Sequence, residues 1–171
     1  QDLFYPKQLI TRRDFIMLSY PFFRSLIHED KFIDTTNETF EFPTDFQDFD
    51  EQYRSYISFL ITNNILSVFE GNLYYPDKEM TRIEVVAAVV RFLSHRDGSF
   101  RSNNLDISFP FWDVPKNHWG REVLKHAYAN QLISKNHNFY PDKVITKDQF
   151  VALLSKTPYA KEQLALMNID D

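Results

Sequence analysis

The sequence lacks cysteine altogether and contains only 3 glycines among its 171 residues. The absence of cysteine excludes disulfides, zinc sites built on thiolates and a cysteine nucleophile. The low glycine content excludes collagen-like and low-complexity chains, and 43% hydrophobic residues are enough to build a folded core. No apolar run reaches the ~18–20 residues that a bilayer-spanning helix needs.

Basic residues are also in the minority, with 19 Lys and Arg against 24 Asp and Glu and a net charge of −5. This balance repels nucleic acid and anionic lipid, so any anion-binding site must be local. The 5 histidines form no H-E-x-x-H pair, and the acidic stretch 45–51 lacks the glycine and terminal glutamate of an EF-hand loop. There is no G-x-S-x-G motif and no P-loop. We therefore expect no enzyme activity, no metal and no cofactor.

One motif occurs three times along the chain: aromatic residues, a proline, an apolar residue, and a threonine five positions after the proline. The prolines are Pro6, Pro76 and Pro141, and the threonines are Thr11, Thr81 and Thr146. Three positions after each threonine stands a residue able to complete a capping box, namely Asp14, Glu84 and Gln149. Apolar residues follow at helical spacing. The pattern predicts a proline turn that leads into a threonine-capped helix in each copy.

A second motif precedes the second and third copies and divides the chain into units. Phe-x-Asp at 46–48 and at 111–113 aligns Asp48 with Asp113, and each motif leads into another amphipathic stretch. A full unit is therefore Phe-x-Asp, a helix, a loop, a proline turn and a capped helix. We expect a partial unit at 1–27, full units at 46–96 and 109–156, and a C-terminal helix within 157–171.

A cation follows each capping threonine: Arg12, Arg82 and Lys147. A cation at the first position of a helix opposes the helix dipole by ~0.3–1 kcal/mol, so its recurrence in three copies calls for a reason. Amide groups left free at a helix start attract anions, and arginine adds charge-assisted bonds to a carboxylate or phosphate. The pattern predicts a local anion site. The alternative is an internal ion pair, in which Arg82 binds Asp48, Asp113 or Glu84.

The unit resembles the S-layer homology domain, most closely in the third copy. The matching residues there are Phe111-Trp112-Asp113-Val114, His118-Trp119, Phe139-Tyr140-Pro141-Asp142 and Ile145-Thr146-Lys147-Asp148-Gln149-Phe150. The resemblance implies an all-α fold of tandem helix-loop-helix units in a three-lobed, pseudo-threefold arrangement. It also implies a ligand pocket built from the cations Arg12, Arg82 and Lys147, the carboxylates Asp48 and Asp113, and the aromatic ring of Trp119. Lys147 departs from the arginine of the family pattern and lacks its planar fork.

The resemblance implies a non-catalytic module that anchors an exported protein on the bacterial cell surface or in the periplasm. Its expected partner is an anionic cell-wall glycan, for example one pyruvylated in the manner of the family's ligands, or peptidoglycan, with no nucleic acid and no membrane insertion. Two alternatives stay open. One is a helical scaffold for an envelope protein partner, with degenerate glycan pockets. The other is a small glycan hydrolase that uses two carboxylates.

Overall fold

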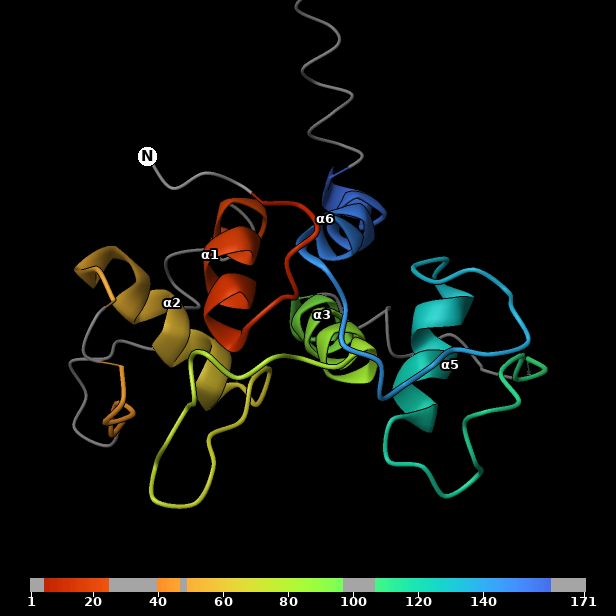
Figure 1. Ribbon diagram of the computed structural model, residues 1–171, viewed down its shortest axis with the longest axis horizontal. Coiled ribbons are helices and arrows are strands. Elements are labelled where there is room, and N and C mark those ends of the chain that lie inside the picture. Colours follow the sequence, from red (N-terminus) through yellow and green to blue (C-terminus); the bar gives the residue numbers. More distant parts are fainter. Residues whose placement is uncertain (1–4, 25–39, 47–48, 97–106, 161–171) are drawn as a thin grey trace, which may run out of the picture.

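The computed structural model describes residues 5–24, 40–46, 49–96 and 107–160. Regular secondary structure in these ranges is helical, with isolated β-bridges and no β-strand, so the all-α prediction is confirmed. The helices are α1 (Arg12–Phe23), α2 (Glu51–Thr62), α3 (Arg82–Arg96), α5 (Arg121–Ala129) and α6 (Lys147–Ser155). Figure 1 shows α3 in the middle of the molecule, between α2 and α5, with α1 beside α6.

The predicted capping threonines lie immediately before α1, α3 and α6. The Thr11 amide donates to the Asp14 carboxylate at 2.9 Å, and the Asp14 amide donates back to the Thr11 hydroxyl at 3.1 Å. The amides of Thr81 and Thr146 donate to Glu84 at 2.8 Å and to Gln149 at 3.1 Å. These bonds satisfy backbone groups that have no partner within the helix, which fixes the point where each helix begins.

The start of each capped helix is hydrogen-bonded to the proline turn of another unit. The first amides of the helices donate to turn carbonyls, Arg12 to Lys78 at 2.9 Å, Arg82 to Lys143 at 2.8 Å and Lys147 to Gln8 at 2.9 Å. The second amides donate to the prolines, Arg13 to Pro76 at 2.7 Å, Ile83 to Pro141 at 3.1 Å and Asp148 to Pro6 at 3.0 Å. The series runs from the first unit to the second, from the second to the third, and from the third back to the first. The prediction that these amides are free for an anion is therefore wrong, because the turns occupy them.

Aromatic side chains fill the space where the capped helices meet. Phe15 of α1 stacks on Phe150 of α6 with ring centroids 5.0 Å apart, and both rings are fully buried. Phe23 of α1 stacks on Phe92 of α3 at 3.9 Å. Two expected features, Asp48 and most of the C-terminal helix, lie outside the described residues.

Candidate functional site

Arg12 is buried and is bonded entirely within the protein. Its Nε donates to the carbonyl of Tyr74 at 2.7 Å, and its Nη2 donates to the carbonyl of Ser67 at 2.5 Å. The guanidinium carbon lies 4.1 Å from the ring centroid of Tyr74 and 5.0 Å from that of Phe69. Arg12 therefore fastens α1 to the loop of the second unit and has no open face for a ligand.

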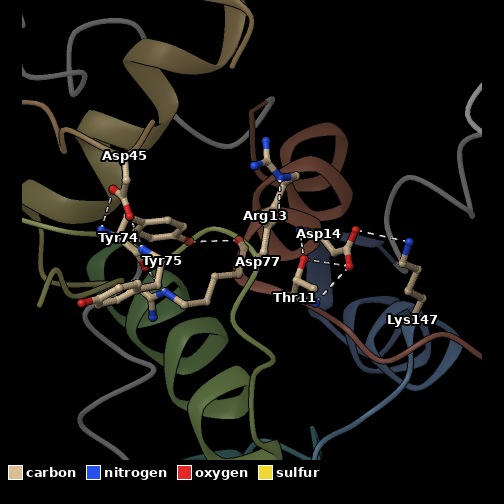
Figure 2. Close-up of polar contacts among 9 residues, drawn as sticks. Thr11, Arg13, Asp14, Asp45, Tyr74, Tyr75, Asp77 and Lys147 are labelled. Carbon is tan, nitrogen blue, oxygen red and sulfur yellow. Dashed lines mark hydrogen bonds and ion pairs between the residues drawn. The ribbon is translucent and has the colours of Figure 1, made fainter. Parts of the chain in front are cut away.

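Lys147 is also held internally. Its Nζ lies 3.3 Å from Oδ1 of Asp14, and the two side chains are only 16% and 18% exposed. Figure 2 shows Asp14 between Thr11 and Lys147, so one carboxylate both caps α1 and pairs with α6. The ion-pair alternative is correct for this cation, although the partner is Asp14 rather than a Phe-x-Asp carboxylate.

Arg82 is different, because it lines a cavity. Its guanidinium lies 5.0 Å from the ring centroid of Phe139, and among the described residues its side chain has no hydrogen-bond or ion-pair partner. The cavity has a volume of about 330 Å³ and lies between the start of α3, the loop of the third unit, and α6. Burial lowers the pKa of the Arg82 guanidinium, yet an arginine stays protonated at neutral pH. The electrostatic attraction between a bound anion and a partly desolvated, unpaired cation is stronger than that between an anion and a fully hydrated cation.

The cavity beside Arg82 is positively charged and polar at its rim and apolar at its floor. Lys135 of the loop and Lys156 after α6 also line it, and none of the described lining residues is Asp or Glu. The amides of the rim are Asn136, Asn138 and Gln149, and the floor includes Phe111, Leu132, Ile133, Phe139 and Leu153. Such a lining suits a ligand that joins an acidic group to a weakly polar ring. Sequence reasoning missed both lysines, because neither belongs to a motif that recurs in all three units.

Asp113 is a structural residue of the proline turn. Its two carboxylate oxygens accept the amides of Phe139 at 2.8 Å and Tyr140 at 2.7 Å. Tyr140 has φ +59°, an unfavourable value for a residue with a β-carbon, and the carboxylate holds the backbone there. In the second unit Asp45 makes the same two bonds, to Tyr74 at 2.8 Å and Tyr75 at 2.7 Å, as Figure 2 shows. The structural counterpart of Asp113 is thus Asp45, which corrects the alignment with Asp48.

The two tryptophans of the third unit do not line the cavity beside Arg82. Trp119 is 56% exposed and lies against Arg91 of α3, with 5.8 Å from the guanidinium carbon to the ring centroid. Trp112 is 79% exposed, and its ring contacts the tilted ring of His137 with centroids 4.8 Å apart. Of the six site residues expected from the sequence, Arg82 alone lines this cavity, and Asp48 is outside the described ranges.

The described residues show neither a metal site nor a membrane span. No group of three or more His, Asp or Glu side chains in these ranges could hold a metal ion. None of the helices seen here combines the length and the hydropathy that a bilayer crossing requires. The groups that line the cavity beside Arg82 offer ionic and hydrogen-bonded recognition through arginine, lysine and amide side chains.

Comparison with known families gives two matching segments. The S-layer homology domain matches residues 44–86 and 110–151, which hold α2, the start of α3, α5 and most of α6. The chain carries S-layer homology repeats. The first matched segment begins just before Asp45, in agreement with the hydrogen bonds that pair Asp45 with Asp113.

Three similar proteins are named for enzymes or cell-surface components. An amylopullulanase of Thermoanaerobacterium thermosulfurigenes is 24% identical over 139 residues, which is 77% of this chain and 7% of the relative. A cellulosome-anchoring protein of Acetivibrio thermocellus is 27% identical over 93 residues, 53% of this chain and 20% of the relative. Cell surface glycoprotein 1 of the same organism is 27% identical over 105 residues, 58% of this chain and 4% of the relative. The chain thus spans a fifth or less of the length of these relatives.

Proposed function

We propose that these S-layer homology repeats anchor their protein non-catalytically at the bacterial cell surface by binding an anionic cell-wall glycan in the cavity beside Arg82. The observation that carries the proposal is an unpaired, partly buried arginine in a cavity of about 330 Å³ whose described lining holds three cations and no carboxylate. A sugar with an acidic substituent, such as a pyruvate ketal, offers the carboxylate for Arg82 and a ring for the apolar floor. The names of two relatives, a cellulosome-anchoring protein and a cell surface glycoprotein, support an extracytoplasmic location.

We further infer that the three units form three lobes about a pseudo-threefold axis. The support is the series of hydrogen bonds from each helix start to the next proline turn, which returns from Lys147 to Gln8. Under this arrangement Arg12 and Arg82 each face the loop of the following unit, whereas Lys147 faces Asp14 of the partial first unit. Two of the three corresponding places hold an arginine, and within the described ranges Arg82 lines a cavity whereas Arg12 is buried under aromatic rings.

A protein-binding scaffold is the second candidate, and the exposed tryptophans favour it. Trp112 and Trp119 present two large aromatic side chains on the third unit. Tryptophan is enriched in the centres of protein interfaces. If this candidate holds, Trp112→Ala and Trp119→Ala remove binding to intact envelopes while Arg82→Ala does not.

The test is binding of the purified chain to purified wall polysaccharide, to the same polysaccharide after removal of its pyruvate by mild acid, and to peptidoglycan. We expect binding to the untreated polysaccharide, with a loss of at least about tenfold in Arg82→Ala, since a charge-assisted bond contributes roughly 1.5–3 kcal/mol. Arg82→Lys keeps the charge but loses the two-pronged donor, so we expect it to bind with intermediate affinity.

Arg13→Ala is the matched control, because it removes the same charge from the second position of a capped helix. Arg13 pairs with the exposed Asp77 at 3.1 Å and does not line the cavity. Equal affinities of Arg82→Ala and Arg13→Ala for the polysaccharide would overturn the proposed site. Binding that persists unchanged on the acid-treated polymer would overturn the acidic substituent as the recognised group.

A further inference from the structure

Arg12 and Arg82 occupy corresponding places but have different surroundings. Each is the first residue of a capped helix. The backbone amide of each donates to the carbonyl oxygen of a turn lysine in the following unit, Lys78 at 2.9 Å and Lys143 at 2.8 Å. Beside Arg82 there is a cavity, whereas the guanidinium of Arg12 is covered by aromatic rings. The reason for this difference lies in the loops that face the two arginines.

Phe69 is the residue that covers Arg12. Its ring contacts two cations, with its centroid 5.0 Å from the guanidinium carbon of Arg12 and 4.5 Å from Nζ of Lys78. In the third unit the corresponding residue is Asn136, which lines the cavity beside Arg82. A hollow of about 390 Å³ in the second unit is lined by Phe69 and Lys78 but not by Arg12, so the ring keeps Arg12 away from it. Beside the shorter Asn136, Arg82 lines its own cavity.

The correspondence of Phe69 with Asn136 follows from both ends of the loop. Ser67 and Ser134 each stand two residues earlier, after matching apolar pairs at 65–66 and 132–133. At the far end, the carbonyls of Asn72 and His137 accept equivalent amides, those of Thr44 at 3.3 Å and Trp112 at 2.8 Å. The second unit therefore has two extra residues between Phe69 and Asn72.

These two extra residues, Glu70 and Gly71, hold Phe69 in place. They let the chain double back, so that the Phe69 amide donates to the carbonyl of Leu73 at 2.7 Å. Gly71 has φ +77°, which is unstrained only for glycine. The insertion therefore builds a tight turn that presents the Phe69 ring to Arg12.

We propose that Phe69 is a built-in plug that closes the site beside Arg12, so that the chain binds one acidic glycan group, at Arg82, where the repeats offer two corresponding places. The inference rests on the proposed function for the nature of the ligand, but the closure itself does not. Replacement of Phe69 by a small polar residue uncovers Arg12 and Lys78, two cations that face the same space. The uncovered place then holds Arg12 and Lys78 next to the carboxylates of Asp45 and Asp77, so we expect a second site for an acidic group that is weaker than the one at Arg82.

Chemical modification tests the closure without any glycan. Phenylglyoxal reacts with accessible arginines, and mass spectrometry of the digested protein reports each site. In the wild type we expect Arg82 to react at least about tenfold faster than Arg12. Phe69→Asn should bring Arg12 close to the rate of Arg82, and Asn136→Phe should slow Arg82. Equal rates at the two arginines in the wild type, or no change at Arg12 in a folded Phe69→Asn or Phe69→Ala variant, would overturn the closure.

Calorimetric titration with a pyruvylated wall oligosaccharide then tests the number of sites. We expect one bound ligand per chain in the wild type, two in Phe69→Asn, and a loss of at least about tenfold in affinity in Asn136→Phe, which keeps every cation. A wild-type stoichiometry of two overturns the plug. If the wild type does not bind the oligosaccharide while the modification rates follow expectation, the proposed function fails and the closure stands.

Discussion

Nζ of Lys147 lies 3.3 Å from Oδ1 of Asp14, and this pair joins the first turn of α6 to the first turn of α1. The other oxygen of Asp14 accepts the amide and the hydroxyl of Thr11, each at 2.9 Å. A lysine at the first position of a helix opposes the helix dipole, and the nearby carboxylate offsets that cost. The same carboxylate therefore couples the cap of one unit to the cation of another.

This coupling predicts unequal effects of the two partners on stability. Asp14→Ala removes the carboxylate half of the capping box and the ion pair, while the bond from the residue 14 amide to the Thr11 hydroxyl stays, and we expect the free energy of unfolding to fall by about 2 kcal/mol. Lys147→Met removes only the ion pair and should cost about 1 kcal/mol or less. Urea denaturation of both variants and of the double variant measures the coupling. A zero coupling term would show that the pair contributes nothing.

Arg12 should matter for stability, whereas its neighbour Arg13 should not. Arg12→Ala leaves the carbonyls of Ser67 and Tyr74 without their donors and opens a void beneath Phe69, so we expect a loss of about 2–3 kcal/mol. Arg13→Ala breaks an ion pair whose acid is 83% exposed and should cost less than about 0.5 kcal/mol. Thermal melts of the two variants give the comparison, and similar melting temperatures would contradict it.

The sequence predicted the parts of this structure that depend on near neighbours along the chain. The capping boxes of Thr11 and Thr81 join residues three positions apart, so spacing alone identifies them. The partners of Arg12 and Lys147 lie 62 and 133 positions away, at Tyr74 and Asp14, and no local pattern encodes such contacts. The alignment of Asp48 with Asp113 failed for a related reason, since the hydrogen bonds from Tyr74 and Tyr75 that mark Asp45 as the counterpart depend on how the turn folds back.

Asp113 should stabilise the proline turn through its charge. Asp113→Asn replaces one accepting oxygen by an amide nitrogen that faces the amide of Phe139 or Tyr140, so we expect a loss of about 1–3 kcal/mol. Asp142→Asn is the matched control, because Asp142 is exposed and has no polar partner among the described residues. Urea denaturation should show a lower midpoint for the first variant only. Equal midpoints would mean that the turn does not depend on the carboxylate.

The ionisation of the Asp148 carboxyl makes the stability of the fold depend on pH in the acid range. The bonds from Lys7 and from the Thr146 hydroxyl lower the pKa of the Asp148 carboxyl to about 2. A carboxyl whose pKa is lower in the folded state stabilises the fold above its unfolded pKa of about 3.9, and this contribution disappears as the pH falls toward 2. Lys7→Met should raise the pKa of Asp148 toward its usual value. Carboxyl-detected NMR titration of the wild type and the variant measures the shift, and an unchanged pKa would contradict the role of Lys7.

Substitution by glycine in the turns that follow α2 and α5 should change the free energy of unfolding by different amounts. Asn64 and Gln131 have φ +55° and +59°, in the left-handed region that costs roughly 1–2 kcal/mol for most residues. Asparagine tolerates this region and glutamine does not, so Gln131→Gly should raise the free energy of unfolding by up to about 1 kcal/mol, while Asn64→Gly should change it little. The gain at Gln131 is the relieved backbone strain less the extra entropy that glycine gives the unfolded chain. Urea denaturation of the two variants separates these outcomes, since a gain at Asn64 equal to that at Gln131 would mean that residue type is irrelevant at this turn.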